Sequence, residues 1–487
     1  MATMPEDQIK PSNGQPAYEP PDEDRAASAS PTEPQLEREL PGGRDAGTGA
    51  HDPYAALRIR DYRLFAAAFL VSVVGGQMQN VAVGWEIYAK TGSALNLGWV
   101  GLVMALPVFL LSLPAGHVAD THSRRRIMMC TAGVSALCAL GLAAVSYFGI
   151  GGKHSLPFMY ALLLLGNAGA TFGRPARSAL MPQLVPPRVF SNAVTWNSSI
   201  FQSASMVGPA IGGFVCALGV PLAYLLTAAC WAGMALIVFR IPDREPPRRG
   251  APARIGDLVA GLRFVFRTKL LLAAMTLDLF AVLLGGATFL LPIFATKVGG
   301  GALTLGWFRA ADAIGAFATS MLIAHLPPFR RAGRMLLLAV VGFGLTTIAF
   351  GLSRSFWLSF AMLVLVGAFD GVSVVVRHTL IQLITPDNMR GRVAAVNQVF
   401  IGSSNELGGL ESGVTAAMFG EVISVVAGGI GTILVVLGVA SVWPQVARLG
   451  SLRDLKPEPD PDAPDAPHGF PVIVPANAPA AHSTTSS

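Results

Sequence analysis

The chain has 487 residues, of which 52% are hydrophobic and only 13% are charged, and its mean hydropathy is +0.53. A soluble protein of this length could not cover its surface with so few charges, so the composition excludes an ordinary soluble protein and indicates a membrane protein. The net charge of +6 does not indicate nucleic-acid binding, because the basic residues lie in loops on one side of the apolar segments.

Residues 1–55 are rich in Pro, Glu, Asp, Ser and Gly, and residues 444–487 are rich in Pro, Asp and Ala. Such segments cannot bury enough apolar surface to order themselves, so both are expected to be disordered cytoplasmic tails. The first residues, MATMPEDQIK, lack the basic stretch and apolar core of a cleavable signal peptide.

Twelve apolar segments of membrane-spanning length lie between the tails. We expect spans at about 62–88, 97–119, 127–149, 157–177, 193–217, 221–239, 270–295, 303–325, 335–353, 356–376, 393–418 and 422–443. One set of connections is rich in arginine, whereas the opposite set holds only Lys90, Lys153, Lys297 and Arg354. This asymmetry predicts that both termini lie in the cytoplasm.

Two weak repeats indicate a duplicated six-helix unit. SALNLGW begins at Ser93 and GALTLGW begins at Gly301, and four residues that follow span 4 recur 200 positions later, Arg177, Leu180, Pro186 and Asn197 as Arg377, Leu380, Pro386 and Asn397. The predicted bundles are residues 56–240 and 269–443, joined by a cytoplasmic linker over 241–268. In that linker an amphipathic helix at the membrane surface is expected, with one apolar face formed by Ile255, Leu258, Val259, Leu262, Val265 and Phe266.

A charged turn, GHVADTHSRRR, separates spans 2 and 3. Gly116, Asp120, Arg124 and Arg125 fit the pattern G-x-x-x-D-(R/K)-x-G-(R/K)-(R/K), while Thr121 and Ser123 depart from it. With this pattern and six plus six spans, residues 56–443 resemble a major facilitator superfamily transporter. GRPARSALMPQLVP after span 4 and ITPDNMRGRV before span 11 are most similar to its transmembrane secretion effector branch, which includes enterobactin-exporter-like and macrolide-efflux-like proteins.

The resemblance implies an all-α fold of twelve transmembrane helices in two pseudo-symmetric bundles, placed in a bacterial inner membrane. It also implies that Asp120 latches the cytoplasmic side shut, with Arg177 and Arg377 as candidates for the same gate network; snorkelling at a helix end is the simpler interpretation of both arginines. In span 5, GPAIGG resembles the antiporter motif of exporters through Gly208, Pro209, Gly212 and Gly213.

Ionisable residues inside the spans are the main candidates for function, because each costs roughly 2.5–3.5 kcal/mol to insert. They are Asp278 in span 7, Arg309 and Asp312 in span 8, Asp370 in span 10, and Glu406 and Glu411 in span 11. Arg309 and Asp312 are three residues apart and could instead neutralise each other. Asp278, Asp370 and Glu406 have no obvious local partner, so one of them is the better candidate to carry a proton. Gln77, Asn80 and Asn197 could line the cavity or hold helices together.

The leading hypothesis is a monomeric, proton-coupled exporter of a small organic compound, a siderophore or a drug-like molecule, that works by alternating access. Its expected partners are the substrate, protons and the lipid bilayer, and no cofactor is expected because the proton gradient supplies the energy. Enzyme activity is not expected, since the chain has no phosphate-binding loop and no metal-ligand spacing. A nutrient importer of the same fold and a transport-inactive membrane receptor or scaffold are the alternatives.

Overall fold

The computed structural model describes residues 52–243, 255–285, 287–326, 329, 331–386, 389–452 and 455. Most of both predicted tails lies outside these ranges. The helices belong to one compact unit that begins at Tyr54. Within the described residues the secondary structure is helical, without strands.

The first six spans are regular helices. After the short helix α2 (Ala55–Arg58) come α3 (Arg60–Thr91), α4 (Ala94–Thr121), α5 (Arg124–Phe148), α6 (Ser155–Leu184), α7 (Phe190–Leu218) and α8 (Val220–Phe239). Glycines in the left-handed region end α3 and α5, at Gly92 (φ 59°) and Gly149 (φ 62°), which satisfies the geometry of a helix C-terminus without strain. The Ser123 side chain caps α5 by accepting a hydrogen bond from the backbone N–H of Arg126 at 3.3 Å.

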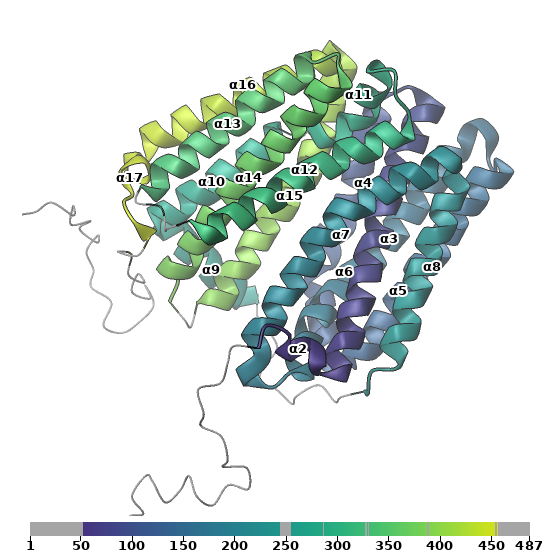
Figure 1. Cartoon of the computed structure of the whole chain (residues 1–487), viewed down its shortest axis with the longest axis horizontal. Helices are drawn as coiled ribbons and strands as arrows, with labels where there is room; N and C mark the ends of the chain where they lie inside the picture. The colour runs from purple at the N-terminus through teal and green to yellow at the C-terminus, as the bar shows by residue number, and fades with distance from the viewer. Residues whose placement is uncertain are drawn as a thin grey trace, which may run out of the picture. The chain divides into compact units, whose positions relative to one another are not determined.

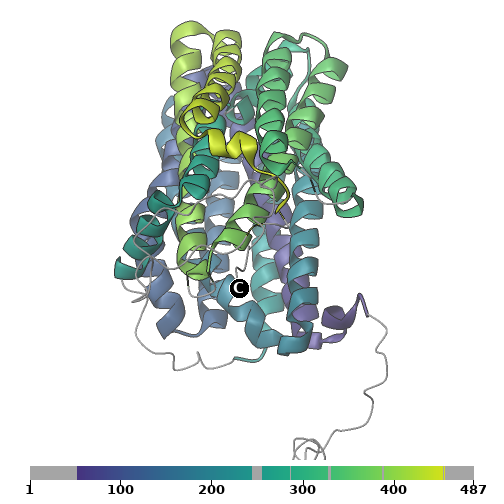
Figure 2. The ribbon, with the colours of Figure 1, turned by 90° about the vertical axis from the view of Figure 1, so that its left-hand side faces the viewer.

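The second six spans follow the helix α9 (Ile255–Arg267). They are α10 (Lys269–Leu284) with α11 (Leu291–Lys297), then α12 (Ala302–His325), α13 (Ala332–Leu352), α14 (Phe356–Ile384), α15 (Arg390–Phe419) and α16 (Glu421–Val442). The short helix α17 (Pro444–Arg448), drawn in yellow in Figure 2, follows α16 and packs against α13 and α10.

Ten helical segments of the described chain are long and apolar enough to cross a membrane. The two predicted spans outside this set are α12 and α15, which carry ionisable residues at their middles, among them Asp312 and Glu411. The prediction of an all-helical, multi-span membrane protein is confirmed.

Helix neighbours repeat between the two sets. In the first set α3 packs against α7 and α8, α5 against α6 and α8, and α4 against α6; in the second, α10 packs against α15 and α16, α13 against α14 and α16, and α12 against α14 (Figure 1). Each contact therefore has its counterpart in the other half, which supports the internal repeat. The bounds of the two bundles stay a prediction.

Span 7 differs from its expected form, because a single helix over 270–295 is interrupted. The helix α10 ends before Gly285, a 3-10 turn η4 spans Ala287–Leu290, and α11 then begins with Pro292 in its first turn. Adjacent glycines disfavour the helix and proline cannot donate its intrahelical hydrogen bond, so the break falls between them.

The amphipathic helix of the linker is present as α9, and its place at the membrane surface stays a prediction. Val265 is buried together with Phe264, whereas Val259, Leu262 and Phe266 of the predicted apolar face are exposed. The buried side packs on α15 and α10, and Gly261 lies against the backbone of Arg392. Contact with the second bundle therefore decides which side of α9 is covered.

Candidate functional site

Two close helix crossings join the halves at the end opposite the arginine-rich connections. Gly98 of α4 faces Gly413 of α15, with 3.0 Å between the Gly413 Cα and the place a Cβ on Gly98 would occupy. Gly213 of α7 faces Gly306 of α12, with a corresponding separation of 2.6 Å. A side chain at any of these positions would meet backbone, so the helices approach this closely only because all four residues are glycine.

These crossings are related by the internal repeat. Gly98 and Gly306 hold the same place in SALNLGW and GALTLGW, and Gly413 follows Gly213 by the 200-residue shift of the second repeat. The backbone neighbours match as well: a Cβ on Gly213 would lie 2.7 Å from the carbonyl oxygen of Ala302, and one on Gly413 would lie 3.0 Å from that of Ala94. The chain thus closes its two halves on each other twice with the same local geometry.

The antiporter-like motif divides between two contacts. A Cβ on Gly208 would lie 2.8 Å from Cβ of Gln77, and one on Gly212 would lie 2.9 Å from Cα of Met78, so these glycines seat α7 on α3 within the first half. Gly213 instead reaches α12 of the second half, and the Pro209 carbonyl lies beside Gly306. Sequence reasoning found Gly213 but missed Gly98, Gly306 and Gly413, although the repeat contained two of them.

A buried ion pair lies inside the second half. Arg377 of α14 donates a hydrogen bond from Nη1 to Asp278 of α10, and their side chains are only 3% and 8% exposed. The same nitrogen lies 3.5 Å from the Ser373 hydroxyl. Asp278 therefore has a partner 99 positions away that the sequence did not reveal, and the interpretation of Arg377 as a snorkelling residue at a helix end is wrong, because the side chain is buried.

The equivalent arginine of the first half has a different partner. Arg177 of α6 lies over the ring of Phe69 in α3, with its guanidinium carbon 4.6 Å from the ring centroid. Both arginines therefore reach from the fourth helix of their half to the first helix. One meets an aromatic ring and the other meets a carboxylate, so of these two arginines only Arg377 forms an ion pair among the described residues.

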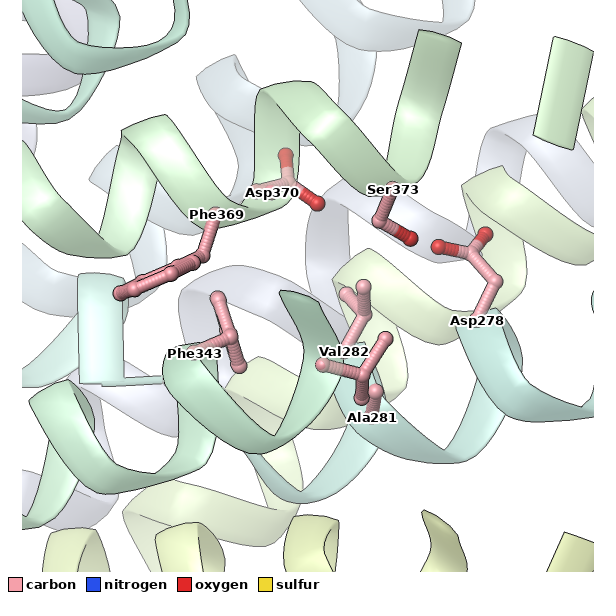
Figure 3. Close-up of a pocket in the computed structure, with 8 residues that line it drawn as sticks. Asp278, Ala281, Val282, Phe343, Phe369, Asp370 and Ser373 are labelled. Atoms are coloured by element: carbon pink, nitrogen blue, oxygen red, sulfur yellow. The ribbon is translucent and has the colours of Figure 1, made fainter. Parts of the chain in front are cut away.

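Two pockets of the described structure lie near this pair. The first, with about 250 Å³ of empty space, lies between α10, α13 and α14 and is lined by Asp278, Ser373 and Asp370 among others. In the view of Figure 3 Ser373 lies between the two carboxylates. The second pocket, of about 740 Å³ and partly open, includes Asp370 and Asp312.

A close contact between α12 and α14 positions the second pair of carboxylates. A Cβ on Gly367 would collide with the carbonyl group of Asp312, so the backbones touch where α14 has no side chain. Asp370 follows Gly367 by one helical turn and shares the second pocket with Asp312. Among the described residues neither carboxylate has a hydrogen bond or an ion pair.

Arg309 does not pair with Asp312 among the described residues. Its Nη2 lies 3.9 Å from where a Cβ on Gly84 would stand, so the side chain extends toward α3 of the other half. Its Nε is buried and has no hydrogen-bond partner within the described part of the chain. The predicted mutual neutralisation of Arg309 and Asp312 is therefore not seen as a direct contact.

The charged turn binds the end of α8. Arg125 donates from Nε to the Val238 carbonyl at 3.3 Å, and Arg126 lies 3.3 Å from Asp243. Asp120 is exposed and has no ion pair among the residues that the structure describes. A Cβ added to Gly116 would have no heavy atom within 4 Å, so no close contact requires glycine there. Arg124 is buried and donates to the Ala179 carbonyl at 3.1 Å. The latch role of this turn stays a prediction.

The remaining candidates are placed but not gathered at one site. Gln77 donates to the Ser205 hydroxyl at 3.4 Å, which ties α3 to α7, while Asn80 and Asn197 are half-buried on the same two helices. Glu406 belongs to α15, but its side chain lies outside the described residues. Across the described chain no group of three His, Cys, Asp or Glu residues could hold a metal ion.

Membrane-length helices, a repeated set of helix contacts and buried carboxylates are the features of a polytopic membrane transporter. A model of the transmembrane secretion effector family matches residues 51–461. The chain belongs to this family of the major facilitator superfamily, whose members are transporters rather than enzymes.

Similar proteins agree with this assignment. The enterobactin exporter EntS of Shigella boydii serotype 18 is 26% identical over 381 residues, which cover 77% of this chain and 91% of the relative. A bacterial homologue of the human lysosomal transporter Spinster, inward-facing and occupied, has a TM-score of 0.62 at 17% identity, covering 84% and 99% of the two chains. An inward-facing bacterial homologue of the iron transporter ferroportin has a TM-score of 0.60 at 17% identity, covering 78% and 99%. At these identities the solved structures show the fold alone.

Proposed function

We propose that the chain is a proton-coupled exporter of a small organic compound, of the siderophore or drug-like class, which works by alternating access as a monomer in the bacterial inner membrane. The observation that carries the proposal is the pair Asp312 and Asp370, two carboxylates at one pocket inside membrane-spanning helices and without ion pairs among the described residues. Groups of this kind in a membrane mark ion and proton pathways.

The direction of transport is supported by the relatives, which are named as exporters. A proton moving inward through the membrane potential releases roughly 2.3 kcal/mol per 100 mV, and this energy is available to drive a substrate outward. The gradient is the expected energy source in place of a cofactor.

Alternating access is supported by the matched glycine crossings. Because Gly98–Gly413 and Gly213–Gly306 repeat the same geometry, the two halves can separate at that end by breaking two equivalent contacts together. The opposite end then closes, and by family resemblance Asp120 and the charged turn hold it. The proton would bind in the second half, because Arg177 of the first half meets Phe69 whereas Arg377 of the second half meets a carboxylate, Asp278.

The test begins with a screen for a substrate. An efflux-deficient bacterial host carrying the chain is compared with the empty host for resistance to a panel of siderophores and drug-like compounds. A compound that scores is then labelled and offered to inverted membrane vesicles with an acid interior. We expect accumulation that a protonophore abolishes. Uptake by intact cells instead of by inverted vesicles would establish the importer and overturn export.

The carboxylates are tested in the same vesicles. Asp370→Asn and Asp312→Asn are expected to lose energised accumulation, and Asp278→Asn and Glu406→Gln complete the panel of predicted proton carriers. Glu411→Gln is the matched control, since Glu411 is a half-buried carboxylate of α15 outside both pockets, where Thr415 donates to it at 2.9 Å. Full accumulation in all four variants would refute the assignment of the proton site.

A further inference from the structure

We infer that the pocket lined by Asp312 and Asp370 takes an organic cation, a molecule with an amine or onium group on an aromatic or aliphatic body. This inference rests on the proposed transport function and selects, between its two substrate classes, the amine-bearing drug-like one. It is argued from the charge, the walls and the backbone of the pocket.

The charge of the pocket is negative. Asp312 and Asp370 line it, and none of the residues that line it is basic. The arginines on the same two helices lie outside the lining, because Arg377 of α14 is held by Asp278 and Arg309 of α12 extends toward Gly84 of α3. An anionic substrate would meet two carboxylates without a lining cation, whereas a cation would supply the missing countercharge.

The walls of the pocket are aromatic and apolar. Phe289, Phe343 and Phe350 come from the η4 turn and α13, and Leu363 and Val366 come from α14. Aromatic faces attract organic cations, and apolar walls desolvate the body of an amphipathic molecule. Such walls disfavour a hydrated inorganic ion, which needs several oxygen ligands in place of carbon surfaces.

The backbone adds to the negative character. The pocket includes Gly285, where α10 ends, and the turn residues Ala287 and Thr288 that follow. The C-terminal end of a helix carries partial negative charge, and broken membrane helices place such ends at cation sites. The break in span 7 therefore faces the same pocket as both carboxylates.

The position of the pocket suits a substrate. The η4 turn at its wall contacts α4 of the first half, and Phe289 lies against Gly409 of α15, so the pocket adjoins the surface where the halves meet. A carboxylate that binds either a proton or the cation makes the two compete, and this competition is what proton antiport requires.

The test compares two ions of the same shape and opposite charge. Purified full-length protein in neutral detergent is dialysed against labelled tetraphenylphosphonium or tetraphenylborate, and partition into protein-free micelles is subtracted. We expect saturable binding of the phosphonium and binding of the borate that is at least about tenfold weaker. Equal binding of the two ions, or stronger binding of the borate, would overturn the inference without any variant.

Substitutions then locate the site. Asp312→Asn and Asp370→Asn are each expected to weaken phosphonium binding about tenfold or more, while Glu411→Gln leaves it unchanged. Unchanged phosphonium binding in both asparagine variants would place the cation elsewhere and refute the assignment. If the protein exports an anion against the proton gradient and does not bind phosphonium, this inference fails and the proposed function stands. If the protein binds phosphonium but transports no compound, the cation site stands and the proposed transport function fails.

Discussion

At the scale of single residues, two arginines at repeat-related positions have acquired different chemistry. Arg377 forms a buried ion pair with Asp278, whereas Arg177 lies over the ring of Phe69. The repeat itself predicts that both side chains reach the first helix of their half. It does not predict the partner, because the residue that each arginine meets on the opposing helix, an aromatic ring in one half and a carboxylate in the other, is set by packing.

This difference predicts unequal effects of the same substitution. Arg377→Ala leaves Asp278 as an unpaired buried charge and is expected to destabilise the protein by about 3–5 kcal/mol. Arg177→Ala removes a contact with a ring and is expected to cost about 0.5–2 kcal/mol. Thermal unfolding of the purified variants in detergent measures both effects.

The double variant Asp278→Asn with Arg377→Gln is the control for the pair. It removes both charges together, so we expect it to be more stable than Arg377→Ala, since no uncompensated charge remains. Equal losses from Arg377→Ala and Arg177→Ala, or a double variant less stable than each single one, would contradict the role of the ion pair.

At the scale of helices, the contacts between the halves depend on missing side chains. The crossings of α4 with α15 and of α7 with α12 bring glycine to glycine, and a core cluster that includes Leu97, Leu291 and Phe308 surrounds this end of both halves. Backbones in such proximity gain van der Waals contact that a larger residue would prevent. The two glycine crossings therefore set how tightly the two halves of the molecule close at this end.

We predict that Gly213→Ala and Gly413→Ala open this end to a similar degree. An added methyl group at either place meets backbone and costs about 1–3 kcal/mol by overpacking. Gly76→Ala is the control, because its Cβ would enter open space and alanine favours a helix over glycine by about 1 kcal/mol. Thermal unfolding is expected to fall for the first two variants and to stay level or rise for the third.

Labelling gives the conformational readout of the same experiment. Leu97 is 2% exposed beside the α4–α15 crossing, so a Leu97→Cys side chain should resist a membrane-impermeant maleimide in the parent protein. In the Gly213→Ala or Gly413→Ala background we expect faster labelling. Unchanged labelling together with unchanged unfolding would show that the crossings do not hold this end closed.

Two helical segments, span 7 and α9, also show which features of a helix could not be predicted from the sequence. The lengths of the helices follow from runs of apolar residues, and the predicted spans agree with α3 to α8 and with α12 to α16. In the sequence the interruption of span 7 is marked by two adjacent glycines and Pro292, whose effect depends on what packs beside them. The side of α9 that protein covers depends on α15 and α10, which bury Phe264 and Val265 through contacts that no local pattern contains.

At the scale of the whole molecule, the fold was more predictable than the site. Hydropathy and the internal repeat are distributed over the chain and tolerate local errors, so the class of membrane fold follows from them. The family follows from the resemblance carried by the charged turn and by the segments after span 4 and before span 11. The site depends on pairs that are far apart in sequence, such as Asp278 with Arg377 and Gly98 with Gly413. The sequence gives the type and position of each of these residues, and for some of them the repeat that relates them. Which partner each residue meets depends on how the helices pack.

The orientation of the molecule in the membrane remains a prediction from charge alone. It can be tested in the two loops that flank α5. His122 precedes this helix in the arginine-rich turn and is exposed, while Ile150 follows it and is 44% exposed. Because basic connections stay on the cytoplasmic side, we expect Ile150→Cys to react with a membrane-impermeant maleimide in intact cells. His122→Cys should react only after the cells are permeabilised.

The parent chain, labelled in parallel, gives the background from its four native cysteines. Reaction of His122→Cys but not of Ile150→Cys in intact cells would show that the molecule has the opposite orientation, with Asp120 on the outer side of the membrane. The proposed cytoplasmic latch would then be excluded, and the glycine crossings would close the inner end instead of the outer one. Reaction of both in intact cells would mean that α5 does not span the membrane, which would contradict the twelve-helix arrangement itself.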